Sequence, residues 1–328
     1  MTAVTRRTLL GSVAGFVVIA APRARAANDA TWPSRTVTII HGFPPGGPTD
    51  VIARIIADGL SKTFGQSVIV EARPGASGTT AAAQVARAAP DGYTLMVIPS
   101  GHPTAAVTFA NLPFRPIDDF TMISLASTYS YVLAVPAASS ITTVAQLIEA
   151  GRTRAIPLTY GTPGIGSGPH LAVELLALQT KIKVQHVPFR GSVPAVTELI
   201  AGRLDFMMDP PAGMMEFIRD GRLRALAVSS AKPYFALPET PTLAAAGVAD
   251  FDVTGWQGLV APAGLPAPIV ARLNGEVARI VREPATIERL HAFGNAPAPS
   301  SPEEFRQRIA SDIAKWSSVV DEIHFSKI

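Results

Sequence analysis

The sequence predicts an α/β fold in which two lobes each contain a mostly parallel sheet flanked by helices. The 328 residues are enough for two domains, and with 48% hydrophobic and 16% charged residues they can form a sizeable core. Short β-branched runs alternate with amphipathic helical runs, as in βαβ units. A strand, a glycine-rich loop and a helix start occur together twice, near residues 37–60 and 158–179.

The first of these units begins with the β-branched run Val37–Ile40, which is typical of a buried strand. The glycine- and proline-rich loop 42–50 follows, and hydrophobic residues at helical spacing then predict a helix over 50–64. Thr49 or Asp50 is the expected N-cap. Free N–H groups of the first helical turn would face the loop, an arrangement that attracts an anion without a cationic side chain.

The first region continues the alternation of strands and helices. Strands are predicted at 68–71 and 94–98, with a helix at 81–88 between them. This βαβαβ order favours a mainly parallel sheet, whose ligands bind beyond the carboxyl ends of the strands. The loops expected at that edge are 42–50, 73–80 and 99–104.

The second region repeats this logic with a strand at 158–160, a glycine-rich loop at 161–170 and a helix at 171–179. More strands are expected at 184–187, 205–208, 225–228 and 259–261, and more helices at 194–201 and 214–220. Two long helices near 268–282 and 302–321 lack a strand unit of their own, so we expect them to pack on the first domain.

The domain division follows from two predicted crossings of the chain, near 130–133 and 251–256. Domain 1 is expected to contain residues 27–131 plus 255–328, and domain 2 residues 132–254. Two crossings form a hinge, and a hinge with an anion-attracting loop on each side predicts a clamshell binder.

Residues 1–26 have the order of an export signal: paired Arg6 and Arg7, an apolar run ending near Ala21, and a small-residue cleavage site at 24–26. The paired arginines are compatible with twin-arginine export and equally with an ordinary Sec signal. Cleavage after residue 26 would leave 24 basic and 25 acidic residues. We therefore expect a periplasmic protein with no basic footprint for nucleic acid.

Several kinds of site are disfavoured by the residues present. There is no cysteine, which excludes thiolate metal sites, disulfides and cysteine nucleophiles. The histidines lack metal-ligand spacing with acidic neighbours, so no metal is expected, and no nucleotide fingerprint is complete, so no cofactor is expected. A serine hydrolase using Ser77, Ser100 or Ser167 stays open as an alternative, although the sequence around Ser77 is an incomplete nucleophile elbow.

Some individual side chains near the predicted loops are also candidates. Arg190 follows a strand and precedes a glycine, so it could contact a carboxylate, although a surface salt bridge is at least as good an interpretation. His102 and His170 fall on ligand-side loops, where a polar lining or a cap is more common than catalysis. Phe189 could add apolar contact, and Asp209 at a strand end could cap or orient a loop.

Motifs spread over nearly the whole mature chain resemble the Bug (TctC-like) family of periplasmic solute receptors, which serve tripartite tricarboxylate transporters. The segments that carry the resemblance are 43–50 (Phe-Pro-Pro-Gly-Gly-Pro-Thr-Asp), 73–78 (Arg-Pro-Gly-Ala-Ser-Gly), 90–95, 112–114 with 119–120, 188–191 (Pro-Phe-Arg-Gly), 221–228, 237–243 and 256–259. Each segment alone is weak, but the combination is specific.

The resemblance implies a two-lobed flytrap of the type II binding-protein kind. A ligand carboxylate would be held by backbone N–H groups and small hydroxyls of residues 43–49 and 162–167, with Ser77 and Ser100 nearby. Typical members carry a Thr or Asn in a small-residue loop near 101–106, where this chain has Ser-Gly-His-Pro-Thr at 100–104, and His41 precedes the first loop. These departures leave the ligand open.

Together, the candidate ligand-binding residues are Phe43, Pro44, Gly46, Gly47, Thr49, Asp50, Ser77, Ser100, His102, Thr162, Gly164, Ile165, Gly166, Ser167, His170, Phe189, Arg190 and Asp209. The predicted function is non-enzymatic capture of a small organic carboxylate, a dicarboxylate or an aromatic acid, by a monomer that delivers it to membrane subunits of such a transporter. A receptor that reports to a sensor kinase is a further alternative.

Overall fold

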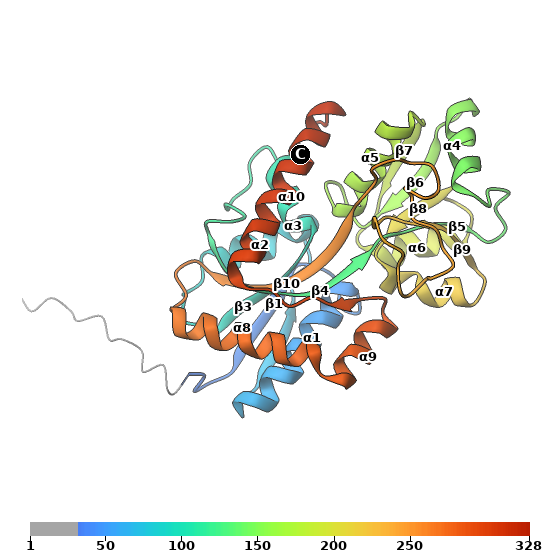
Figure 1. Cartoon of the computed structure of the whole chain (residues 1–328). Coiled ribbons are helices and arrows are strands. Elements are labelled where there is room, and N and C mark those ends of the chain that lie inside the picture. The colour runs from blue at the N-terminus through green and yellow to red at the C-terminus, as the bar shows by residue number, and fades with distance from the viewer. Residues whose placement is uncertain (1–31) are drawn as a thin grey trace, which may run out of the picture.

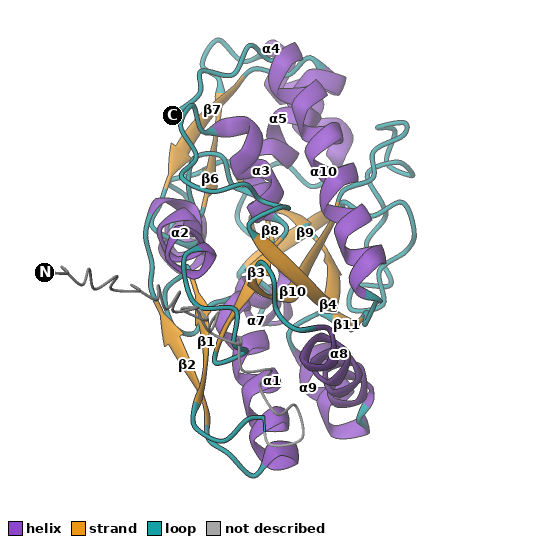
Figure 2. Ribbon diagram, turned by 90° about the vertical axis from the view of Figure 1, so that its left-hand side faces the viewer, coloured by secondary structure: helices purple, strands orange, loops and turns teal. Residues whose placement is uncertain are grey.

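The computed structural model describes residues 32–328, so the predicted export signal at 1–26 lies outside the described residues. The described elements form two sheets, each flanked by helices, and this confirms the α/β class (Figures 1 and 2). Within residues 32–328, none of the helices combines the length and the apolar character that crossing a bilayer requires.

The first sheet has six strands in the order β11-β4-β10-β3-β1-β2. Its strands are β1 (Val37–His41), β2 (Val68–Ala72), β3 (Thr94–Pro99), β4 (Phe120–Ser130), β10 (Thr254–Pro262) and β11 (Ala296–Pro297). The helices around it are α1 (Pro48–Phe64), α2 (Thr79–Ala86) with the short turn η2 (Ala76–Gly78) before it, α3 (Gly101–Thr108), α8 (Ala267–Arg282), α9 (Pro284–Ala292) and α10 (Pro302–Glu322).

The second sheet has five strands in the order β7-β6-β8-β5-β9. Its strands are β5 (Val132–Pro136), β6 (Leu158–Thr162), β7 (Val184–Pro188), β8 (Phe206–Asp209) and β9 (Leu223–Val228). Its helices are α4 (Val144–Thr153), α5 (Gly168–Thr180), α6 (Ser192–Ile200) and α7 (Met215–Arg219), with the short turn η3 (Pro211–Gly213).

The sheets are mixed, which corrects the expectation that they are mostly parallel. Pairing is parallel for β1 with β2 and β3, and for β6 with β7 and β8. It is antiparallel for β10 with β3 and β4, for β11 with β4, and for β5 with β8 and β9. The βαβ units pair in parallel as the sequence predicts, whereas β5 and β10 follow the crossings between sheets and so run the opposite way.

The hydrophobic cores lie on the faces of these sheets. Ile52 and Ile56 of α1 pack with Leu273 of α8 against one face of the first sheet. Helix α10 begins on the other face with Phe305, but its last turns place Trp316 in the core of the second sheet. The sequence predicted that α10 packs on the first domain, and the structure shows that it contributes to both cores, as its long diagonal path in Figure 1 suggests.

Helix α3 was expected as a loop, because Gly101 and Pro103 disfavour a helix interior. Both residues fall within its first turn, where the N–H that proline lacks would have no intrahelical acceptor. Strand β4 was also not predicted, because its polar residues break the apolar pattern. Its Ser124, Ser127 and Ser130 are buried and hydrogen-bonded.

Candidate functional site

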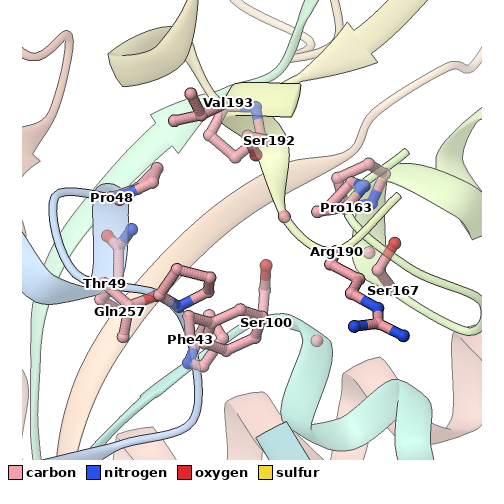
Figure 3. A pocket seen from close by; sticks show the side chains of 18 of the residues that line it. Phe43, Pro48, Thr49, Ser100, Pro163, Ser167, Arg190, Ser192, Val193 and Gln257 are labelled. Atoms are coloured by element: carbon pink, nitrogen blue, oxygen red, sulfur yellow. The ribbon is translucent and has the colours of Figure 1, made fainter. Parts of the chain in front are cut away.

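A cavity of about 310 Å³ lies between loops that follow strands of both sheets (Figure 3). Its lining residues are Phe43, Pro44, Pro45, Gly47, Pro48, Thr49, Pro99, Ser100, Gly101, Tyr129, Tyr131, Pro163, Ser167, Gly168, Pro169, Arg190, Gly191, Ser192, Val193, Pro194, Pro210 and Gln257. Apart from prolines and glycines, the lining consists of the apolar Phe43 and Val193, four serine and threonine hydroxyls, two tyrosines, one amide and one guanidinium. Among the described residues, Arg190 is the one charged side chain in this lining.

Four helices present their N-termini to the cavity. Helices α1, α3, α5 and α6 begin after the N-cap residues Gly47, Ser100, Ser167 and Gly191, and all four caps line it. Only the cap of α5 has a side-chain hydrogen bond to its own helix, so the first-turn N–H groups of the other three lack that partner. The positive ends of four helix dipoles and one guanidinium therefore make a site suited to an anion.

The sequence predicted two of these helix ends, those of α1 and α5. Helix α6 was predicted from residue 194, but its N-terminus was not assigned to the ligand, although Gly191 and Ser192 before an apolar run are a recognisable helix start. The end of α3 was missed with its helix. The backbone of α5 comes close to Tyr131 at this point, because a Cβ on Gly168 would collide with the Tyr131 hydroxyl.

The first loop, between β1 and α1, is held by the carboxylate of Asp50. This buried side chain accepts hydrogen bonds from the backbone N–H of Gly46 at 3.0 Å and from Arg54 at 2.8 Å, and it pairs with His41 Nε2 at 2.9 Å. Burial raises the pKa of Asp50, but the bonds to Arg54, Gly46 and His41 outweigh it and the pKa is lowered. Asp50 thus braces the loop and does not line the cavity.

The second loop, between β6 and α5, is held by uncharged groups. Thr162 Oγ1 lies 2.6 Å from His186 Nε2, and the N–H of Gly166 donates to His170 Nδ1 at 3.0 Å. The two imidazoles stack with centroids 3.8 Å apart. Burial lowers the pKa of His170 to about 3, with a further contribution from His186, whose own pKa burial lowers to about 4. Ser167 accepts from the N–H of His170 and donates to the carbonyl of Gly164 at 2.7 Å.

Gln257 and two tyrosines are lining residues that the sequence reasoning missed. Gln257 Oε1 accepts from Ser127 Oγ at 2.6 Å and from Asn295 Nδ2 at 3.0 Å, which leaves the amide N–H₂ without a recorded partner. Tyr131 OH lies 3.0 Å from Ser100 Oγ, and burial raises its pKa to about 12. Gln257 lies just before the strand predicted at 259–261, and no local pattern indicated that this side chain would face a ligand.

The predicted site residues fall into three groups. Those lining the cavity are Phe43, Pro44, Gly47, Thr49, Ser100, Ser167 and Arg190. A neighbouring groove of about 730 Å³ shares part of this wall and is also lined by Ser77, Gly164, Ile165 and Phe189. Those that line neither are Gly46, Asp50, His102, Thr162, Gly166, His170 and Asp209.

Apart from the exposed Gly46, whose N–H donates to Asp50, the third group is buried or half-buried away from both spaces. His102 is buried against Phe114 and Phe120 and bonds to the carbonyl of Pro116 at 3.1 Å, and burial lowers its pKa to about 4. Gly166 supplies backbone at the loop turn with φ +72°. Asp209 is completely buried behind the cavity wall.

Direct contacts join loops of the two sheets beside the cavity. Ser77 Oγ donates to the carbonyl of Ile165 at 3.0 Å, and Thr104 Oγ1 lies 2.6 Å from the carbonyl of Gly166. Ser77 and Thr104 follow strands of the first sheet, and their acceptors follow β6 of the second. These bonds hold loops of the two sheets together beside the cavity.

The serines considered as nucleophiles have other partners. Ser77 and Ser167 donate to backbone carbonyls, and Ser100 pairs with Tyr131. Within residues 32–328, the hydrogen bonds of the histidine imidazoles do not reach any of the three, and Ser167 meets His170 only through the backbone N–H. In the same residues, no group of three or more His, Asp or Glu side chains could hold a metal ion. A serine–histidine pair, which a hydrolase of this kind needs, is thus not formed there.

Comparisons with known proteins give a consistent family. A family model described as "Tripartite tricarboxylate transporter family receptor" matches residues 52–325. A "UPF0065 protein in tcbD-tcbE intergenic region" of Pseudomonas sp. (strain P51) is 36% identical over 318 residues, which are 97% of this chain and 94% of that protein. Protein BugT of Bordetella pertussis is 32% identical over 317 residues, covering 96% of this chain and 97% of BugT.

Solved structures agree with this assignment. "R. palustris Rpa4515 with adipate" is 33% identical with a TM-score of 0.87, covering 90% of this chain and 100% of that one. MatC (Rpa3494) from Rhodopseudomonas palustris "with bound malate" is 34% identical with a TM-score of 0.82, covering 88% and 100%. The chain therefore belongs to the TctC, or Bug, family of periplasmic solute-binding receptors, as its motifs predicted.

Proposed function

We propose that the protein captures a small organic carboxylate, a dicarboxylate or an aromatic acid, between its two lobes. The observation that carries the proposal is the convergence of four helix N-termini and one guanidinium on the cavity. Its volume of about 310 Å³ is at the lower end of the roughly 300–1,000 Å³ usual for ligand sites, which favours a small acid. The relatives whose structures hold adipate and malate support the same ligand class.

The energetics are compatible with micromolar binding. A helix end contributes about 0.3–1 kcal/mol to a nearby anion, and up to about 2 kcal/mol when it is partly buried. A micromolar Kd corresponds to about 8 kcal/mol. Hydrogen bonds from Thr49 and from the Gln257 amide, with apolar contact on Phe43, would supply the remainder.

The proposal includes a hinge, a location and a delivery partner. Residues 27–131 with 255–328 would form one lobe and 132–254 the other, with the hinge where β4 leads into β5 and the chain returns to β10. The ligand would stabilise the closed form through its higher affinity for that form, with no bond broken. The closed receptor, acting as a monomer in the periplasm, would then deliver the acid to transporter subunits in the membrane.

Isothermal titration calorimetry tests the ligand class. We expect at least one of malate, adipate, succinate and benzoate to bind with micromolar or tighter Kd, whereas glucose and putrescine produce no heat of binding. Binding of the neutral sugar alone would overturn the proposal.

A charge variant in the cavity sharpens the test. Gln257→Glu keeps the side-chain shape but brings a negative charge to the cavity, so affinity for the acid should fall at least tenfold. Gln185→Glu makes the same charge change at an exposed position of β7 and should leave affinity unchanged. Equal affinities of the two variants would place the anion elsewhere.

Capture of the membrane partner tests delivery. The ligand-saturated receptor, crosslinked in native membranes, should recover integral transporter subunits of the tripartite tricarboxylate type. If a sensor kinase is recovered and the transporter subunits are not, the receptor serves signalling and the proposal of delivery to a transporter is wrong.

A further inference from the structure

Asp209 is a buried acid that the site described above leaves without a role. Asp209 is the last residue of β8 and is 0% exposed. Neither of its carboxylate oxygens has a hydrogen-bond partner among the described residues. The next residue, Pro210, lines the ligand cavity. An unpaired carboxylate in such a position is costly, so the arrangement calls for a proton or a partner.

The carboxyl group lies next to Ser192, the first residue of α6. A Cβ built on Gly213 would be 3.9 Å from Asp209 Oδ2 and 3.7 Å from Ser192 Cβ, so both groups border the same small space. Ser192 itself lines the cavity, and Figure 3 shows it on the wall across from Phe43 and Ser100. Ser192 therefore borders both the ligand cavity and the space beside Asp209.

No cation of the described chain compensates the charge of Asp209. Burial raises its pKa to about 7, and Ser192, although outside good hydrogen-bond geometry, lowers it in part. The titratable groups that face it are Tyr129 and Tyr131, and burial raises the pKa of both phenols. On β5 its partner is Val132, and the α6 residues that border the Gly213 position beside it are Ser192 and Val196, none of them charged.

The Ser192 hydroxyl has one hydrogen to donate, and the state of Asp209 decides its direction. If Asp209 is ionised, it attracts that hydrogen, and Ser192 turns its lone pairs towards the cavity. If Asp209 carries a proton, it can donate to Ser192 Oγ, and the hydroxyl hydrogen is free to point at a ligand oxygen. A carboxylate ligand is repelled in the first state and bound in the second.

We propose that Asp209 is a specificity-determining residue that acts through Ser192, and that it holds a proton whenever the cavity holds an anion. This inference rests on the proposed function, because it needs a negatively charged ligand. Above neutral pH the ionised Asp209 takes one proton from solvent as the ligand enters, and no covalent bond of the ligand changes. Binding then depends on pH although the ligand itself is fully ionised.

The pH dependence of binding tests the proposal, with adipate and malate as probes between pH 6 and 8.5. Kd should change little with pH near pH 6. Above pH 7.5 it should rise about tenfold per pH unit, because binding then requires the uptake of one proton. At pH 8, binding enthalpies in phosphate and in Tris should differ by the buffers' difference in ionisation enthalpy, which reports uptake of nearly one proton.

Two variants assign the effect to the residue. Asp209→Asn imitates the neutral acid, so this variant should bind the probe at pH 6. Its Kd should be the same at pH 8.5, and binding should take up no proton. Asp58→Asn removes an acid that is 56% exposed on α1 and should behave as the wild type does. A wild-type Kd that is flat with pH, or a slope retained in Asp209→Asn, would overturn the inference while leaving carboxylate binding intact.

A measurement without ligand separates this inference from the proposed function. The pKa of the Asp209 carboxyl is raised from about 3.8 in the unfolded chain to about 7 in the folded protein. Its contribution to stability is therefore fully present below pH 3.8 and is lost as the pH rises through 7. Asp209→Asn should therefore gain urea stability over the wild type as the pH rises from 5 to 8. A constant difference would refute the buried proton even if every acid in the panel binds, and a rising difference without any binding would point to failure of the proposed function alone.

Discussion

The β1–α1 loop and the β6–α5 loop both lead from a strand end to a helix start at the cavity, but different chemistry supports them. The first depends on an ionised carboxylate, Asp50, that gathers Gly46, His41 and Arg54. The second depends on neutral imidazoles and hydroxyls, with His170 and His186 stacked behind it. An anion site can therefore be built over a buried negative charge on one side, provided that the charge is satisfied by its own loop.

The difference also predicts that the two loops lose support at different pH values as the pH falls. The first loop loses its support when a carboxylate is protonated, which needs a pH below about 4. The second loop loses its support when an imidazole is protonated. The free energy of unfolding begins to fall already below pH 6.5, because the histidine of the unfolded chain takes up the proton at a higher pH than that of the folded chain. The second loop should thus be the weaker part of the site in mild acid.

The largest effect is expected from Gly166→Ala. A Cβ there would be 2.5 Å from Thr108 Oγ1 across the two lobes, and φ is +72°. Gly46→Ala, in the first loop, has φ +80° and nothing within 4 Å of the added atom. Calorimetry should show a loss of ligand affinity of tenfold or more for Gly166→Ala, whereas Gly46→Ala costs about 1 kcal/mol of stability from its backbone alone.

Thr108→Ala in the Gly166→Ala background removes the crowding atom and should restore part of the affinity. If the two glycine variants lose affinity equally, contact between the lobes is not what distinguishes the loops.

The next effect concerns Asp50→Asn, which should lower the free energy of unfolding at pH 7 by about 2–3 kcal/mol in urea, because three hydrogen bonds lose their charge. The pKa of Asp50 is lowered in the folded state, so its contribution is present above about pH 4 and is lost as the pH falls further. Asp58→Asn, on the exposed side of the same helix, is the control. Similar losses for both would argue against the bracing role.

A pH-dependent effect is expected at His170. Its folded-state pKa of about 3 lies below the unfolded value near 6.5, so protonation favours the unfolded chain, and the wild type should lose about 2 kcal/mol from this residue by pH 5. His170→Gln, followed by urea denaturation from pH 7.5 to 5, should show a flatter profile. His291→Gln changes an exposed histidine and should leave the slope as it is. If His170→Gln leaves the dependence of the unfolding free energy on pH unchanged, His170 is not the source of the acid sensitivity.

The smallest effect concerns the two helix caps. Ser167→Ala removes the N-cap of α5 and should cost about 1 kcal/mol in thermal unfolding, whereas Gly47→Ser at α1 should gain a few tenths of a kcal/mol. A gain in stability for Ser167→Ala would contradict the cap.

Most of the order of elements could be predicted, with α3 and β4 as exceptions, because local patterns carry it. The run Val37–Ile40 and the apolar spacing after Asp50 indicated β1 and α1, and the repeated glycine loop indicated β6 and α5. The motifs also identified the family, since short glycine- and proline-rich segments need particular residues for their backbone conformations. In both loops the sequence therefore indicated a helix end that attracts an anion.

The tertiary structure decided which side chains meet. Gln257, Tyr131 and Ser192 reach the cavity because β10, the β4–β5 crossing and α6 converge there, and no local pattern encodes a contact between segments that far apart in the chain. Asp50 and His170 were expected in the two loops, but they lie in the first turns of α1 and α5, and packing keeps both side chains out of the cavity lining. Which way a side chain faces depends on the burial of all its neighbours at once, and this is a property of the folded molecule and not of any stretch of sequence.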